Sequence, residues 1–319
     1  MIINKVQANY YSINAYGGQV RDKQSFVYHQ NLHDDIFIRS KTLREVSFSG
    51  ASFFEKFVGD YLRQRAYKTS IKGSKRPYLS MDKELAPMIK SVKIKVSNLE
   101  KINAWDINPN NSKDYVIFLH GFSQNITNNQ PLYKELAKTR FGILAIDYRG
   151  YGKNPKSIYT KEDDMVQDVK SAMKYLKDKG VKNIGLIGHS FGAYLGAKVS
   201  SQVKPDFLIM VSPISSLEFW LRNVILHPKK YKLEMSLIKY VKDFREQYSK
   251  IFKISDYLKN NPTDMYVLQT SNDRYVKSAC VDELVSGIKN LKQYTKIKAG
   301  GHRMEDNKIK AIRTILEGL

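Results

Sequence analysis

The spacing of hydrophobic positions changes along this chain at about residue 89. The preceding residues, 1–88, are polar, rich in Tyr, Asn and Lys, and weakly periodic. Within them, apolar residues recur at helical spacing over 52–64, and glycine and proline breakers predict an exposed connection over 63–87. We therefore expect an N-terminal extension of unknown role over 1–88, followed by a larger domain over 89–319.

Strand signals dominate the start of the larger domain. Val92, Ile94 and Val96 alternate with polar residues, as in a half-buried edge strand, and a second strand is predicted over 101–107. Continuous apolar runs, typical of parallel strands buried on both faces, follow at 115–119, 142–146, 184–187, 207–211 and 265–269, and a last strand is predicted at 295–298.

Helical patterns separate these strands. The clearest is 161–179, where Met165, Val169 and Met173 share one face. Antiparallel strands followed by alternating strands and helices predict an α/β fold, with a mostly parallel sheet and helices on both faces. The connection 213–260 is too long for a simple crossover and has helical patterns of its own, so we interpret it as an inserted helical cap. Further helices are predicted at 130–138, 191–203, 278–288 and 307–316.

A candidate nucleophile lies between a predicted buried strand and a predicted helix, in Gly188-His189-Ser190-Phe191-Gly192. A serine at such a tight turn adopts a strained backbone, and flanking glycines remove side chains that would clash there. The hydroxyl is then presented at the carboxyl end of the sheet, beside a helix N-terminus that stabilises negative charge. This G-x-S-x-G pattern in this context predicts that Ser190 is catalytic.

The region from about residue 89 to the C-terminus resembles the α/β-hydrolase fold, most closely its branch of serine esterases, lipases and serine-aminopeptidase-like proteins. That fold implies the chain order nucleophile, acid, histidine. Asp273 follows a predicted strand in Thr270-Ser271-Asn272-Asp273 and matches the acid, and His302 follows two glycines after the last strand and matches the histidine. The resemblance implies that His302 takes the proton of Ser190 while Asp273 orients the imidazole.

The same resemblance implies an oxyanion hole of two backbone N–H groups. One belongs to Phe191, the residue after the nucleophile, and the other to Phe122 in His120-Gly121-Phe122-Ser123. We interpret His120 and His189 as structural. The stretch 147–152 resembles the D-x-R-G-x-G turn of the family and is interpreted as architectural, since it lacks the features of a phosphate-binding loop.

The charge and cysteine content of the chain limit the kinds of partner and cofactor that we expect. The net charge is +22, but the lysines are spread along the chain, which favours a solvated basic surface. An anionic substrate or a transient contact with an anionic membrane surface is the alternative, and no nucleic-acid-binding motif is present. The single cysteine, Cys280, excludes a disulfide framework and a cysteine-based zinc site. No metal or cofactor is expected.

The apolar stretches of the chain are too short for a signal peptide or a bilayer span, which predicts a cytoplasmic protein and leaves non-classical secretion open. In the predicted cap, the apolar segment 219–226 precedes Lys229, Lys230 and Lys232. This segment either packs on the domain or contacts an acyl chain or membrane surface.

Together these features predict a serine hydrolase that cleaves a carboxylic ester or thioester with an acyl chain, through an acyl-enzyme intermediate. An acyltransferase and an amidase or peptidase use the same triad and stay open as alternatives. A non-catalytic binding protein of the same fold is disfavoured because Ser190, Asp273 and His302 are all competent residues. Substrate and oligomeric state do not follow from the sequence.

Overall fold

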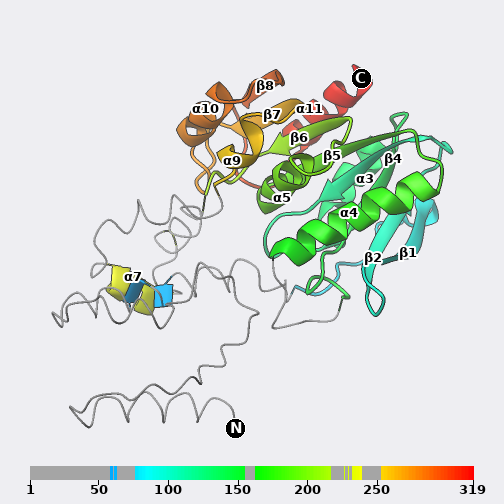
Figure 1. Ribbon diagram of the computed structural model, residues 1–319, viewed down its shortest axis with the longest axis horizontal. Coiled ribbons are helices and arrows are strands. Elements are labelled where there is room, and N and C mark those ends of the chain that lie inside the picture. Colours follow the sequence, from blue (N-terminus) through cyan, green and yellow to red (C-terminus); the bar gives the residue numbers. More distant parts are fainter. Residues whose placement is uncertain are drawn as a thin grey trace, which may run out of the picture.

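Residues 89–319 contain an eight-stranded sheet with helices on both faces (Figure 1). It is seen in a computed structural model of the chain. The structure describes residues 58–59, 61–62, 76–154, 162–216, 226, 229, 232–238 and 253–319.

The strand order is β1-β2-β4-β3-β5-β6-β7-β8. Strand β2 is antiparallel to both of its neighbours, and every other pair is parallel. The predicted fold class and all eight predicted strands are therefore confirmed. Their bounds are β1 Ile89–Lys95, β2 Lys101–Ile107, β3 Asp114–Leu119, β4 Gly142–Ile146, β5 Asn183–His189, β6 Phe207–Val211, β7 Asp264–Thr270 and β8 Leu291–Ile297.

Two hydrophobic clusters hold helices against opposite faces of the sheet (Figure 1). The first cluster includes apolar side chains of α4 (Glu162–Asp178), α5 (Phe191–Ser200) and α10 (Ser278–Ser286). The second includes those of α3 (Gln130–Leu136) and α11 (Asp306–Glu317). These helices match those predicted at 130–138, 161–179, 191–203, 278–288 and 307–316. None of the helices that the structure describes is both long and apolar enough to cross a bilayer.

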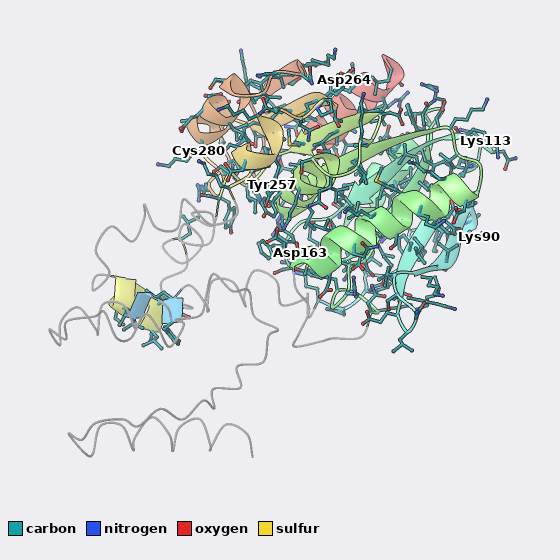
Figure 2. All side chains as sticks on the ribbon, in the orientation of Figure 1. Lys90, Lys113, Asp163, Tyr257, Asp264 and Cys280 are labelled. Carbon is teal, nitrogen blue, oxygen red and sulfur yellow. The ribbon has the colours of Figure 1, made fainter. Side chains whose placement is uncertain are left out.

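The predicted cap lies mostly outside the described residues, including nearly all of segment 219–226. Within it the structure describes α7 (Lys232–Ile238) and α9 (Ser255–Leu258). The ring of Tyr257, labelled in Figure 2, packs edge-on against Tyr194 of α5. Helix α9, at the end of the predicted cap, therefore packs against α5. The predicted helix at 52–64 is described only at 58–59 and 61–62, where the backbone is helical.

Residues 76–85, here called the strap, lie before β1 and pack on the domain. Leu85 is fully buried in the same cluster as α3 and α11, and the 3₁₀ helix η3 (Ala86–Met88) then leads into β1. The backbone N–H groups of Leu79 and Asp82 donate to Thr127 and Gln130 at 2.9 and 2.7 Å. The strap is mostly exposed, as the sequence predicts, but it is anchored to the domain at several points.

The turn after β4 is held by Arg149. Its backbone N–H and its guanidinium both donate to the buried carboxylate of Asp168 on α4, each at 2.7 Å. The guanidinium also donates to Glu100 at 2.9 Å. These bonds fix α4 to the turn, which agrees with the architectural interpretation of the D-x-R-G-x-G match.

Candidate active site

Ser190 stands between β5 and α5, in the backbone conformation that the motif predicts. Its φ of 55° and ψ of −113° lie in a region that L-residues rarely adopt, and its side chain is buried. A Cβ on Gly188 would lie 2.4 Å from the carbonyl oxygen of Gly192. A Cβ on Gly192 would lie 2.0 Å from the carbonyl oxygen of Leu119. Only glycine therefore fits at either side of the turn.

The three predicted triad residues come together from loops at the carboxyl ends of β5, β7 and β8. His302 Nε2 lies 2.9 Å from Ser190 Oγ, and His302 Nδ1 lies 2.7 Å from Asp273 Oδ2. The hydrogen bond to Asp273 places a proton on Nδ1 and leaves Nε2 to accept from the serine hydroxyl. The side chain of His302 is 13% exposed, whereas that of Asp273 is fully buried.

The carboxylate of Asp273 is stabilised by hydrogen bonds. Its other oxygen accepts from the backbone N–H groups of Tyr275 and Val276, at 2.8 and 2.9 Å. Burial acts to raise the pKa of Asp273, but the hydrogen bond and charge of His302 and the two N–H groups outweigh burial and lower it. Asp273 is therefore ionised at neutral pH, the state that an imidazolium partner needs.

The two predicted oxyanion residues lie side by side. Phe122 is in the loop after β3, Phe191 is the first residue of α5, and their rings stack with centroids 4.5 Å apart. The N-terminal end of a helix carries N–H groups without intrahelical partners, so Phe191 is placed where an anion is stabilised. The structure thus brings all five predicted site residues into one region.

Hydrogen bonds from side chains outside the strands hold the loop that carries Phe122. Gly121 N–H donates to the side chain of Gln124 at 3.0 Å, and the Tyr148 hydroxyl donates to the carbonyl of His120 at 3.0 Å. Asp147 accepts from Ile126 N–H at 2.9 Å and also from the hydroxyl of Tyr78. Tyr78 belongs to the strap, so the oxyanion loop and the strap meet at one carboxylate.

His120 is buried, as its structural interpretation predicts. Burial lowers the pKa of His120 to about 4 and raises the pKa of Asp147 to about 6. His120 Nε2 lies 3.6 Å from Asp147 Oδ1, which is within ion-pair range but too long for a hydrogen bond. Because His120 is neutral at physiological pH, we treat this approach as a packing contact rather than an ion pair.

His189, next to the nucleophile, also contacts the triad. Its Nε2 lies 2.7 Å from the carbonyl oxygen of His302, to which it donates. Burial, followed by the charges of His302 and Lys308, lowers the pKa of His189 to about 3, so the ring is neutral. Besides packing in the turn, His189 therefore holds the loop that carries His302.

Sequence reasoning missed two residues near the site, Tyr78 and Lys308. Tyr78 lies in a polar stretch without periodicity, so no local signal marks it. Lys308 is fully buried on α11, among the apolar positions Ile309, Ile312 and Leu316. A lysine within an apolar helical stripe was the available signal, because such a side chain is rarely fully buried without partners.

Comparison with known proteins identifies the family to which the chain belongs. A family model described as serine aminopeptidase, S33, matches residues 110–308, more than half of the chain. The chain belongs to this family. It is thereby a member of the α/β-hydrolase superfamily, as the sequence motifs imply.

Relatives of this S33 family chain are named as esterases. A carboxylesterase of Bacillus subtilis is 28% identical over 121 residues, which are 37% of this chain and 49% of that protein. A putative esterase/lipase of Mycoplasma pneumoniae is 26% identical over 113 residues, 35% of this chain and 42% of that protein. The chain thus matches less than half the length of these curated relatives.

Solved structures resemble the S33 family chain in fold. An esterase of Pyrococcus furiosus aligns with a TM-score of 0.64 and 24% identity, over 77% of this chain and 97% of that one. An esterase of Exiguobacterium antarcticum aligns with a TM-score of 0.56 and 16% identity, over 72% and 98%. At such identities the likeness establishes the fold alone.

Proposed function

We propose that this protein hydrolyses carboxylic esters through an acyl-enzyme on Ser190. The observation that carries the proposal is the continuous hydrogen-bond chain from Ser190 Oγ through His302 to Asp273, at the carboxyl ends of the strands. An isolated serine hydroxyl is too weak a nucleophile for an ester, and this chain supplies the base that activates it. The esterase names of the relatives support an ester as substrate.

In the first half-reaction, His302 Nε2 takes the proton of Ser190 Oγ as the oxygen attacks the ester carbonyl. The backbone N–H groups of Phe122 and Phe191 stabilise the negative oxygen of the tetrahedral intermediate. His302 then gives the proton to the departing alcohol, leaving the acyl group on Ser190. Water, activated by the same imidazole, releases the acid and restores the serine. Asp273 stays ionised throughout and stabilises the imidazolium.

The acyl group is proposed to be apolar. The ring of Phe122 is partly exposed and stacks on buried Phe191, beside the nucleophile. An aromatic surface at this position favours an acyl chain over a charged group, since burial of apolar area is favourable. Thioesters present the same acyl group and fit the same site. The inserted segment 213–260 is proposed to form a cap over it.

A second candidate is aminopeptidase activity, which the description of the matching family favours. The same triad serves, because His302 can protonate a departing amine as well as an alcohol. Esters and amides differ here in how much the leaving group needs that proton. A direct comparison of the two substrates therefore decides between them.

Labelling with a fluorophosphonate, followed by intact-mass analysis, tests the proposal. We expect one adduct on the wild type and none on Ser190→Ala. Ser201→Ala is the matched control, because Ser201 lies at the other end of α5. Its exposed hydroxyl donates to the backbone carbonyl of Lys198. Absence of an adduct on folded wild-type protein would overturn the proposal and favour a binding role.

Unlabelled enzyme should then be assayed with p-nitrophenyl esters of two to twelve carbons, an acyl thioester and an amino-acyl p-nitroanilide. The proposal expects ester turnover at least tenfold above amide turnover in kcat/KM. Faster amide cleavage would favour the aminopeptidase. Added alcohol acceptors would reveal acyl transfer as ester products in place of free acid.

A further inference from the structure

Lys308 has an unusual environment for a lysine. It lies in the first turn of α11, and its side chain is fully buried. Its ammonium donates to three acceptors, Ser212 Oγ at 2.9 Å, the carbonyl of Gly301 at 2.7 Å and the carbonyl of Arg303 at 3.0 Å. An ammonium has three N–H donors, so each donor has one acceptor.

Two of these acceptors are the carbonyl groups immediately before and after His302. The carbonyl of His302 itself accepts from His189. Gly301 also accepts from the hydroxyl of Thr270 at 2.8 Å. Three consecutive carbonyl groups around the catalytic base are therefore held by side chains from β5, β7 and α11.

We propose that Lys308 is a positioning residue for the general base, because its buried amino group holds the carbonyl groups of the two residues that flank His302. This inference rests on the proposed function of Ser190. A displacement of about 1 Å in a catalytic group can lower the rate about a hundredfold, so fixing this loop has a direct catalytic consequence. No contact of Lys308 with substrate is implied.

The charges around Lys308 come from several elements. Asp273 after β7 and Glu305 before α11 favour the ammonium, and neutral His189 of β5 faces it. Burial nevertheless outweighs them and lowers the pKa of Lys308 to about 8. A neutral amine keeps two N–H donors for the two carbonyls, and the Ser212 hydroxyl can then donate to its nitrogen. The hydrogen bonds from Lys308 to the carbonyls of Gly301 and Arg303 therefore depend on the position of its nitrogen more than on its charge.

Lys308→Met tests the role, because methionine fills similar space without any donor. The matched control is Lys310→Met, an exposed lysine two residues further along α11. Pre-steady-state fluorophosphonate labelling gives two numbers, the fraction of molecules labelled and the rate of labelling. We expect Lys308→Met to label completely but about 10- to 100-fold more slowly, with kcat for an ester lowered by the same factor and KM within about threefold. Lys310→Met should match the wild type.

The rate and the extent of labelling distinguish a misplaced His302 loop from a loss of folded protein. A purely structural role would lower the labelled fraction and leave the rate of the folded molecules unchanged, which would overturn the proposal. A deficit confined to pH values below 8 would assign the effect to charge and also overturn it. If Lys308→Met does not fold, Thr270→Val decides, because it removes one donor from Gly301. We expect it to label about threefold more slowly, and an unchanged rate would contradict the proposal.

Failure of this inference differs from failure of the proposed function. Wild-type protein that does not label at Ser190 would overturn both. Wild-type protein that labels, together with Lys308→Met that labels equally fast and completely, would overturn only the role of Lys308.

Discussion

Two aspartate–histidine pairs lie near Ser190, and they differ in the distance within the pair and in the pKa of the aspartate. His302 and Asp273 are joined by a hydrogen bond of 2.7 Å, and the pKa of Asp273 is lowered. His120 and Asp147 approach only to 3.6 Å, and the pKa of Asp147 is raised to about 6. The same two residue types thus form a hydrogen-bonded pair in one place and a packing contact with a neutral histidine in the other.

The difference comes from the partners of each carboxylate. Asp273 accepts from His302 and from two backbone N–H groups, which together outweigh the effect of burial. Asp147 uses its oxygens on Ile126 N–H and on the Tyr78 hydroxyl, and burial remains the largest influence on its pKa. Proximity of an acid and a histidine is therefore a weak indicator of catalysis. The hydrogen bonds around the acid decide whether its charge is available to the imidazole.

Replacement of each aspartate by asparagine gives the largest expected contrast. Asp273→Asn should lower kcat about 10⁴-fold, since asparagine favours the wrong tautomer of His302 and cannot stabilise its charge. Asp147→Asn should lower kcat less than tenfold, because the carboxylate of Asp147 accepts from Ile126 N–H and the Tyr78 hydroxyl, whereas His302 is bonded to Asp273. Steady-state ester kinetics on both variants measure the contrast. Equal losses in the two variants would mean that the Asp147 pair also takes part in catalysis.

Removal of the anchor of the strap should have the next largest effect. Leu85→Ala deletes a fully buried side chain, and the resulting cavity should lower the free energy of unfolding by about 2–5 kcal/mol. Leu79→Ala, in the same strap but 52% exposed, should change it by less than about 0.5 kcal/mol. Urea unfolding measures both. A loss for Leu85→Ala as small as the loss expected for Leu79→Ala would mean that Leu85 does not anchor the strap to the domain.

Much of the fold could be predicted because its central strands are buried on both faces. The predicted ranges 101–107 and 207–211 coincide with β2 and β6. Strand β8 begins four residues before its predicted start because it lies at the edge of the sheet, where polar residues interrupt the apolar pattern. The triad was equally predictable, since each member follows a strand within a local motif.

The supporting contacts could not be predicted, because they join residues far apart in the chain. Tyr78 reaches Asp147 across 69 positions, and Lys308 reaches Ser212 across 96. Periodicity describes which face of a helix is buried, but it does not give the acceptor that a buried ammonium will find. The sequence thus indicates the candidate site residues better than the side chains that hold them in place.

The two aspartates should also respond to pH with opposite sign. The folded-state pKa of Asp147 is raised, so acidification from pH 7 through about 6 adds a proton to the folded state only and should increase the stability of the wild type relative to Asp147→Asn. The full gain, reached near pH 4, is roughly 3 kcal/mol at 1.36 kcal/mol per pKa unit. The pKa of Asp273 is lowered, so its contribution is present above about pH 4 and is lost on further acidification. Urea unfolding at several pH values compares each variant with the wild type, and a flat difference for Asp147→Asn would contradict the raised pKa.

The smallest expected effect isolates the bond between the strap and the oxyanion loop. Tyr78→Phe removes the hydroxyl that donates to Asp147, and it should lower the free energy of unfolding by about 1 kcal/mol at pH 7. This bond also lowers the pKa of Asp147, so its loss should move the acid-dependent gain in stability to higher pH. The matched control is Tyr133→Phe, because the buried hydroxyl of Tyr133 makes no hydrogen bond to any residue that the structure describes. Tyr133→Phe should leave both the stability and its pH dependence unchanged or slightly improve stability. If both variants behave alike, the contact between Tyr78 and Asp147 does not couple the strap to the loop.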